Sequence, residues 1–291
     1  MNLANSPVTK ISFLGREWHI KRDDLLDERL SGNKARKLYR FAANPVSAKR
    51  ILSYGGAQSN AMYSISELAK AQGVEFVYYA KTLPATLRQT PSGNLKAALD
   101  NGMRLIELPH TQYESRIAEL LTRGDGNTLL IRQGGADEYA RDGLRMLSEE
   151  LAQYTADNKL KDPIAVMSSG TGTSAGYLAD YLPFECLTVP CVADGSFLDA
   201  EFDRLGVSKK PTVIETADKI AFASPHPKLL STYRELLSCG IEFDLIYDAK
   251  CWLAVSENLD YFEGRDVIFV HSGGTLGNET QLERYRYKGL A

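Results

Sequence analysis

The stretch of sequence that decides the fold is residues 50–80, RILSYGGAQSNAMYSISELAKAQGVEFVYYA. It begins with a short run, 50–54, and ends with a second one, 75–80, and both are rich in apolar β-branched or aromatic residues. The segment between them, 60–72, has the apolar spacing of a helix. A strand, a connecting helix and a second strand form the unit from which parallel sheets are built, so this stretch predicts an α/β fold.

The same alternation continues on both sides of this unit. Further strands are predicted at 10–14, 17–21, 104–108, 128–132, 164–167, 186–192, 212–215, 243–247 and 266–271, and helices at 33–43, 91–101, 112–122 and 142–155. A polar link at 157–162 separates an earlier series of strands from a later one and is the predicted boundary between them. The chain as a whole is therefore expected to form parallel sheets flanked by helices.

Composition excludes several classes of protein. The chain has 291 residues, enough for a large buried core, and its net charge of −3 in mixed order does not suit nucleic-acid binding. No stretch is apolar enough to cross a bilayer, so neither nucleic acid nor a membrane is an expected partner. The four cysteines lack paired spacing and the histidines lack metal-ligand spacing, so we expect a cytoplasmic protein with reduced thiols and no metal.

Five segments at predicted strand ends are rich in Gly, Ser, Thr and Asn. They are 31–34, 55–60, 134–135, 168–176 and 271–274. The carboxyl ends of strands are where ligands bind in open α/β sheets. The run 168–176, SSGTGTSAG, follows a strand and opens a helix, so its N–H groups can hold a phosphate. Its glycine spacing matches neither the dinucleotide nor the P-loop fingerprint, and a tight turn explains it equally well.

Lys34 is the candidate nucleophile. It stands at the start of a predicted helix with Arg36 and Lys37 close by, and the positive neighbours and the helix start are both expected to lower its pKa. An amine with a pKa near neutrality can form a Schiff base with a carbonyl group. A solvated surface lysine is the alternative for this position.

Two more segments supply polar and aromatic groups. The turn at 55–60 offers Gln58, Ser59 and Asn60, which either face a ligand or cap the helix that follows. Tyr247 and Asp248 end a predicted strand; they either meet the ring and nitrogen of a cofactor, or are a core tyrosine and a helix cap. An amine, a phosphate cradle, an aromatic face and a carboxylate together meet the requirements of pyridoxal 5′-phosphate.

The motifs SGNKARKL, GGAQSN, SSGTGTSAG, DLIYDAKCW and HSGG, in this order between residues 21 and 274, resemble the 1-aminocyclopropane-1-carboxylate deaminase and D-cysteine desulfhydrase family. These are fold-type-II pyridoxal phosphate enzymes, similar to the tryptophan synthase β subunit. The resemblance implies a homodimer. It also implies a large cofactor-binding domain, 1–44 and 141–291, and a small domain, 45–140.

The resemblance assigns a role to each matched residue. Implied cofactor-binding residues are Lys34, Asn60, Gly170, Thr171, Gly172, Thr173, Tyr247 and Asp248. Implied catalytic residues are Lys34, Ser59 and Tyr247, and implied substrate-binding residues are Gln58, Ser59 and Ser272. Among them, Lys34 would form the Schiff base, Tyr247 would stack on the ring and Asp248 would face the pyridine nitrogen. Asn60 would contact the phenolic oxygen, and 170–173 would hold the phosphate.

Three positions depart from the family pattern and bear on the substrate. Asp248 stands where the deaminases have Glu, whereas Ser272 is the hydroxyl residue typical of the desulfhydrases. Phe222 lies where the deaminases carry a tyrosine thought to help open the cyclopropane ring. We therefore predict a deaminating lyase that converts D-cysteine to pyruvate, sulfide and ammonia. The alternatives are 1-aminocyclopropane-1-carboxylate deamination to 2-oxobutyrate and ammonia, cofactor binding with little turnover, and a nicotinamide-dependent enzyme.

Overall fold

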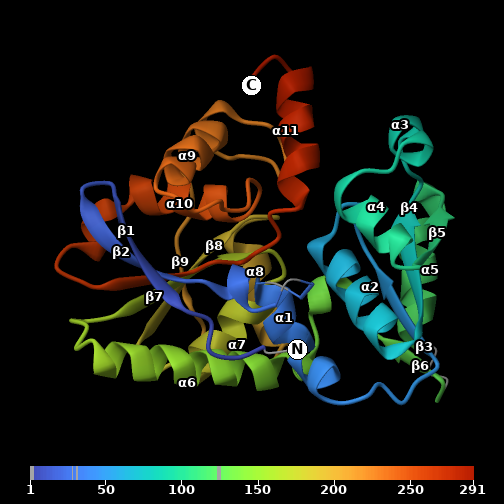
Figure 1. Ribbon diagram of the computed structural model, residues 1–291, viewed down its shortest axis with the longest axis horizontal. Helices are drawn as coiled ribbons and strands as arrows, with labels where there is room; N and C mark the ends of the chain where they lie inside the picture. The colour runs from blue at the N-terminus through green and yellow to red at the C-terminus, as the bar shows by residue number, and fades with distance from the viewer. Residues whose placement is uncertain (1–2, 28, 31, 123–125) are drawn as a thin grey trace.

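The structure is a computed structural model that describes residues 3–27, 29–30, 32–122 and 126–291, so Ser31 of the first motif lies outside the described residues. Figure 1 shows two groups of elements side by side, and each group is built on a sheet of its own. The α/β architecture follows from the alternation of strands and helices along the chain.

The larger sheet has six strands in the order β1-β2-β10-β7-β8-β9. They are β1 (Val8–Phe13), β2 (Arg16–Lys21), β7 (Ile164–Ser169), β8 (Glu185–Pro190), β9 (Thr212–Val213) and β10 (Val267–Val270). The pair β1 and β2 is antiparallel, and the other pairs are parallel. The central strands β7 and β10 are buried along their whole length, as expected of strands covered on both faces.

Helices cover both faces of the larger sheet because successive residues of a strand point to opposite sides. Val166 and Phe269 pack on one face with Trp252, whereas Met167 and Val270 pack on the other with Leu178. The first face is covered by α9 (Pro227–Ser238) and α10 (Asp248–Glu257), and the second by α6 (Arg141–Asp157), α7 (Thr173–Tyr181) and α8 (Gly195–Arg204).

The smaller sheet has four parallel strands in the order β5-β4-β3-β6. They are β3 (Arg50–Tyr54), β4 (Glu75–Lys81), β5 (Arg104–Leu108) and β6 (Thr128–Leu130). One face packs against α2 (Asn60–Gln72) and α4 (Gly93–Asp100), and the other against α5 (His110–Thr122). Tyr78 faces the first side and Tyr79 the second, so both rings are core residues, as the alternation of a strand requires.

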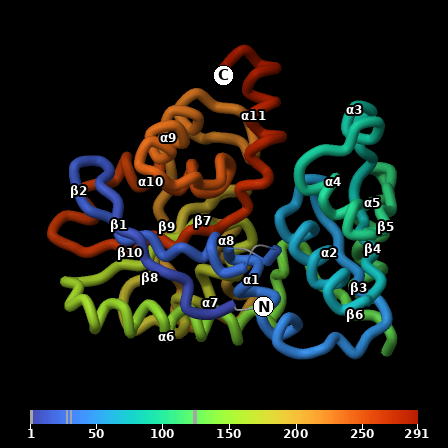
Figure 2. The backbone as a smooth tube through the Cα atoms, viewed as in Figure 1, coloured from blue at the N-terminus to red at the C-terminus, as the bar shows by residue number. Residues whose placement is uncertain are grey.

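The helix α1 (Gly32–Ala43) lies where the two groups meet. Its Ala35 and Leu38 pack into the core of the smaller group, while its Arg36 backbone lies against Gly143 of α6. Figure 2 shows the chain leaving α1, crossing into the smaller group and returning to α6. The remaining elements are α3 (Ala85–Gln89), α11 (Gly277–Tyr287) and the short helices η1 (Asp23–Leu25), η2 (Gln133–Gly135), η3 (Glu138–Ala140) and η4 (Leu259–Phe262).

The predicted boundary at 157–162 is wrong. This link joins α6 to β7, and both belong to the group of the larger sheet, because the chain leaves the smaller sheet earlier, after β6. The division into a large domain, 1–44 and 141–291, and a small domain, 45–140, stays a prediction. Each of the two sheets lies within one of these two parts.

The strand predicted at 243–247 is also wrong, because the segment forms a turn that leads into α10. The Asp244 carboxylate accepts hydrogen bonds from the backbone N–H groups of Ile246 and Tyr247. The N–H of Leu245 donates instead to Asn278 Oδ1, at 2.8 Å. With their donors taken by side chains, these residues have no N–H left for a neighbouring strand, although their β-branched and aromatic composition is typical of one.

Within the part of the chain that the structure describes, no helix combines the length and apolar character needed to cross a membrane.

Candidate active site

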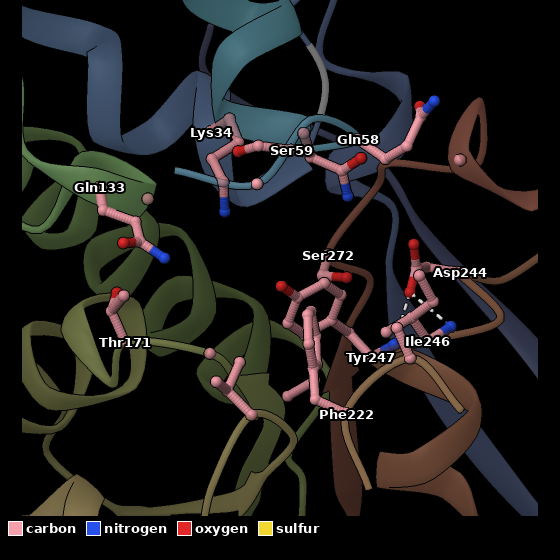
Figure 3. A pocket seen from close by; sticks show the side chains of 18 of the residues that line it. Lys34, Gln58, Ser59, Gln133, Thr171, Phe222, Asp244, Ile246, Tyr247 and Ser272 are labelled. Atoms are coloured by element: carbon pink, nitrogen blue, oxygen red, sulfur yellow. Dashed lines mark hydrogen bonds between the residues drawn. The ribbon is translucent and has the colours of Figure 1, made fainter. Parts of the chain in front are cut away.

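A cavity of about 1180 Å³ lies between the two groups of elements, at the carboxyl ends of the parallel strands of both sheets. Figure 3 shows the Lys34 side chain pointing into it, with Thr171 on one side and Tyr247 and Ser272 on the other. Ser59 approaches from the start of α2. Segments far apart in the sequence therefore converge here because the strand ends of an α/β sheet share one edge.

Ten of the eleven predicted site residues line this cavity. They are Lys34, Gln58, Ser59, Asn60, Gly170, Thr171, Gly172, Thr173, Tyr247 and Ser272. The remaining one, Asp248, is fully buried behind the cavity wall. Their individual roles stay predictions.

The amine of Lys34 donates a hydrogen bond to Asn33 Oδ1, at 2.8 Å. Burial lowers its pKa to about 8, and this effect is opposed by the nearby carboxyl groups of Asp244 and Asp248. A lysine with this pKa is partly neutral near physiological pH, and only the neutral amine is a nucleophile. The expected direction of the pKa shift is therefore confirmed, but its main cause is burial.

The two positive neighbours of Lys34 have other partners. The Arg36 guanidinium is fully buried and forms ion pairs with Asp23, at 2.8 Å, and with Glu150, at 2.7 Å, so it holds α1 against the N-terminal segment and α6. Lys37 lines the cavity and donates to the carbonyl oxygen of Gly134, at 2.9 Å. Burial lowers the pKa of Lys37 well below its usual value, and the charge of Lys34 lowers it further.

The start of α7 can hold an anion. Gly172 precedes the helix with a left-handed φ of 68°, and no side chain caps the first turn. The buried Ser174 hydroxyl has no hydrogen-bond partner among the described residues. Gly134, whose carbonyl binds Lys37, lies against Thr171 of the same loop. N–H groups that no side chain caps, a hydroxyl without a partner among the described residues and the nearby Lys37 amine together suit a phosphate.

Tyr247 forms one wall of the cavity, and the turn described above fixes its position. Its ring is tilted by 58° against that of Phe222, with 5.7 Å between the ring centroids. Asp244, which anchors the turn, also lines the cavity, and burial, with the adjacent Asp248, raises its pKa to about 7. The sequence analysis did not single out Asp244; the available signal was an aspartate two residues before the N–H groups of a turn.

The turn before α2 supplies a second polar wall. Ser59 caps α2, because its hydroxyl accepts a hydrogen bond from the N–H of Met62 at 3.3 Å, so the capping role predicted as the alternative is confirmed. Gln58 donates to the carbonyl oxygen of Ser92 at 3.0 Å, while its own Oε1 has no partner among the described residues. The Asn60 Oδ1 accepts from Asn94 at 2.6 Å.

Behind Tyr247, Asp248 is surrounded by hydrogen-bond donors. The hydroxyls of Ser168 and Ser272 both donate to its Oδ1, at 2.8 and 2.7 Å, and the N–H of Ser272 donates to Oδ2 at 3.2 Å. His271 Nδ1 lies 3.5 Å from the same Oδ2. Burial raises the pKa of Asp248, and His271 and the donated hydrogen bonds oppose this rise.

No family model matches this chain. Among curated proteins, a D-cysteine desulfhydrase from Yersinia enterocolitica is 28% identical over 92% of this chain and 91% of its own length. A protein from Thermotoga maritima, provisionally named as a 1-aminocyclopropane-1-carboxylate deaminase, is 26% identical over 98% of both chains. The crystal structure of a homologue of that deaminase superposes with a TM-score of 0.79, at 21% identity, over 98% of this chain and 95% of the other.

These comparisons confirm two predictions. The resemblance to the 1-aminocyclopropane-1-carboxylate deaminase and D-cysteine desulfhydrase family extends over nearly the whole chain. The fold is the α/β fold of that family, with parallel sheets flanked by helices, classed as fold type II.

Proposed function

Since this chain resembles the 1-aminocyclopropane-1-carboxylate deaminase and D-cysteine desulfhydrase family, we propose that it is a deaminating lyase that binds pyridoxal 5′-phosphate and acts on D-cysteine. The protein is an enzyme of the pyridoxal phosphate-dependent lyases and deaminases. The observation that carries the proposal is the cavity in which the partly neutral Lys34 amine faces the uncapped start of α7. A nucleophilic amine and an anion site are what attachment of this cofactor needs.

Each wall of the cavity has a share in holding the cofactor. The N–H groups at the start of α7, the Ser174 hydroxyl and the Lys37 amine would hold the phosphate. Lys34 would bind the aldehyde carbon, and Tyr247 would cover the ring. Bound pyridoxal phosphate withdraws electrons from the Cα of an amino acid and so makes its proton acidic.

The chain's own groups then move the protons. The Lys34 amine would accept the proton from the substrate Cα, and the Ser59 hydroxyl would be the second acid or base group at the same carbon. In D-cysteine the Cβ–S bond breaks as that proton leaves, so sulfide departs with the bonding electrons. Addition of water to the remaining fragment gives pyruvate and ammonia. Gln58, whose Oε1 has no partner among the described residues, lines the same cavity and would lie near the substrate carboxylate.

Two side chains favour D-cysteine over 1-aminocyclopropane-1-carboxylate. Ser272 is the residue type expected of the desulfhydrases, and it lines the cavity. Phe222 lies against Tyr247 but has no hydroxyl with which to take part in ring opening. The cyclopropane substrate is therefore the second candidate, supported by the relative from Thermotoga maritima. A homodimer and a cytoplasmic location remain parts of the proposal.

An absorbance spectrum with borohydride reduction tests the cofactor and the lysine together. The purified protein with added pyridoxal phosphate should show the near-ultraviolet or visible absorbance band of an imine between the cofactor and a lysine. Borohydride reduction should then leave the cofactor attached to the peptide that contains Lys34. The loaded protein should then release pyruvate and sulfide from D-cysteine faster than 2-oxobutyrate from 1-aminocyclopropane-1-carboxylate. Absence of the absorbance band, or the label on another peptide, would refute the proposal. Faster release of 2-oxobutyrate would favour the second candidate.

A further inference from the structure

We propose that Asp244 is a positioning residue. Its carboxylate links the Asn60 side chain of the smaller group to the turn that carries Tyr247 in the larger group, and so fixes the direction in which Asn60 donates into the cavity. The effect on a ligand rests on the proposed function, because it requires pyridoxal phosphate in the cavity. The link itself is a property of the protein alone.

The first observation is how Asp244 uses its two oxygens. Asp244 is only 1% exposed and lines the cavity, where Figure 3 shows it beside Ile246 and Tyr247. The N–H groups of Ile246 and Tyr247 both donate to Oδ1, so Oδ2 remains for a donor from another segment. The Asn60 side chain supplies a donor: its hydrogen bond to this carboxylate keeps the pKa of Asp244 lower than burial alone would.

The second observation is the orientation of the Asn60 amide. Its Oδ1 accepts from Asn94 Nδ2 at 2.6 Å, and the same Asn94 nitrogen also donates to the carbonyl oxygen of Gln58 at 3.0 Å. The Nδ2 of Asn60 therefore points away from Asn94. It lies against Gly274 of the larger group, where a Cβ would be only 2.1 Å from it. The smaller group thus holds the amide oxygen, and the larger group surrounds the amide nitrogen.

The consequence concerns the two N–H donors of the Asn60 amide. Asp244 accepts from one of them, so the other can donate to a ligand in the cavity, which Asn60 lines. Rotation of the amide by half a turn would place its oxygen against the Asp244 carboxylate, and two acceptors cannot share a hydrogen bond. Asp244 therefore keeps a donor directed at the ligand. The resemblance implies that this donor meets the phenolic oxygen of the cofactor.

The link also joins two walls of the cavity that belong to different groups. Asn60 is the first residue of α2, and Asp244 anchors the turn before Tyr247. This turn is tied to α11 as well, because the N–H of Leu245 donates to Asn278. Neither wall can move away from the other without breaking the bond between Asp244 and Asn60. The donor of Asn60 and the ring of Tyr247 are therefore held at a fixed spacing.

The alternative is that Asp244 acts only through its charge, which raises the pKa of Lys34. A double-mutant cycle separates the two explanations, because an effect carried by a contact disappears with the partner, whereas an effect of charge stays. The readout is the absorbance of pyridoxal phosphate attached to Lys34, which requires no turnover. A donor beside the phenolic oxygen favours its ionised form, and this form absorbs at longer wavelength.

Asp244→Asn keeps an oxygen for the turn but turns an amide nitrogen toward the Asn60 amide, so the ratio of the long-wavelength to the short-wavelength band should fall. The fall should be smaller in an Asn60→Ala background, by about twofold or more, because side chains in contact couple by at least this amount. Glu283→Gln neutralises another carboxyl group of the cavity wall and should leave the ratio unchanged. An equal fall in both backgrounds, or no fall in Asp244→Asn, would overturn the positioning role.

Thermal unfolding of the protein without cofactor tests the link itself. Asp244→Asn places two amide groups face to face, and Asn60→Asp places two carboxyl groups face to face, so each change should lower Tm. Together they restore one hydrogen bond in the opposite direction, from the amide at 244 to the carboxylate at 60. The double variant should therefore lose less than the sum of the two single losses. A loss equal to that sum would show that the two side chains are not bonded.

The outcomes are separable. If no cofactor attaches to Lys34, the proposed function fails, and the role of Asp244 toward the cofactor fails with it; the unfolding temperatures still decide whether Asp244 binds Asn60. If the cofactor attaches and the cycle shows no coupling, only the positioning role is overturned. Should Asp244→Asn fail to fold, Asp244→Ser replaces it in the spectroscopic cycle, because a serine hydroxyl can still cap the turn but has no second oxygen for Asn60.

Discussion

Two turns of the molecule each connect a parallel strand to a helix, but only one of the two helices has a side-chain cap at its start. In the smaller sheet, β3 leads through GGAQSN into α2, and in the larger sheet β7 leads through a glycine loop into α7. Ser59 caps α2 by accepting from the N–H of Met62. Gly172 precedes α7 and no side chain caps it. Both helix starts face the same cavity.

The presence or absence of a cap shows how two similar turns can bind different groups. An uncapped helix start leaves its N–H groups and positive dipole end for an external anion. A capped one has satisfied its own donors, so what it offers a ligand is its side chains. Accordingly, α7 is suited to the phosphate, whereas the polar groups before α2 are suited to the substrate.

The largest effect is expected from Lys34, which lines the same cavity as the two turns. Lys34→Ala should lower turnover by about 10³-fold or more, because it removes both the point of attachment and the proton acceptor. Product formation from D-cysteine measures this loss. Lys70→Ala, on the exposed end of α2, is the matched control and should leave turnover unchanged. Wild-type turnover in Lys34→Ala would contradict the proposed function.

A smaller effect is expected at the capped turn. Ser59→Ala should destabilise the protein by about 1 kcal/mol through loss of the cap, and should lower kcat by about 10²-fold through loss of an acid or base group. Ser59→Asp keeps a capping oxygen but not the hydroxyl, so it should recover stability without recovering kcat. Thermal unfolding and initial rates separate the two effects. Equal recovery of both would mean that Ser59 acts only as a cap.

At the uncapped turn, Gly172→Ala should weaken the binding of pyridoxal phosphate. The new Cβ would lie 2.8 Å from Phe202 Cε1 at a φ of 68°, so the loop must move, at a cost of about 1–3 kcal/mol. If the whole cost falls on the bound state, the cofactor affinity should decrease by about 5- to 150-fold. Gly56→Ala, in the other turn, has nothing within 4 Å of its Cβ and should bind normally. Equal affinity in both variants would argue against a phosphate site at α7.

The smallest expected effect is a shift along the pH axis. Only the neutral Lys34 amine reacts, and its pKa is about 8, so the rate of cofactor attachment should rise with pH and level off above this value. Asp244 raises the pKa of Lys34, so Asp244→Asn should move the midpoint to lower pH. Stopped-flow absorbance after addition of pyridoxal phosphate measures the profile. A midpoint near that of an ordinary lysine would show that Lys34 is not buried in solution.

Several features could be predicted from the sequence because they depend on neighbouring residues. The strands at 50–54 and 75–80 and the helix at 60–72 follow from hydrophobic period, and the structure has them at β3, β4 and α2. The motif around Lys34 likewise predicted that this residue lies where the strand ends meet, and the structure has it in the wall of the cavity.

Other predictions were wrong because residues far away in the sequence determine the local structure or the local charge. The segment 243–247 has the composition of a strand, but Asn278, more than thirty residues away, takes one of its N–H groups. Arg36 was expected to act on Lys34, but its charge is paired with Asp23 and Glu150. Side-chain hydrogen bonds and ion pairs of this kind leave no periodic signal in the sequence.

The sequence by itself determined the α/β alternation, the glycine turns at strand ends and the family resemblance, since these depend on local period, turn chemistry and motif order. Only the tertiary structure decided which groups face the cavity. Ser168, Asp248 and Ser272 come from three separate segments, and their hydrogen bonds place one carboxylate behind two hydroxyls. A buried polar group must find its partners wherever the fold brings them, so its contacts follow from packing rather than from its neighbours in the chain.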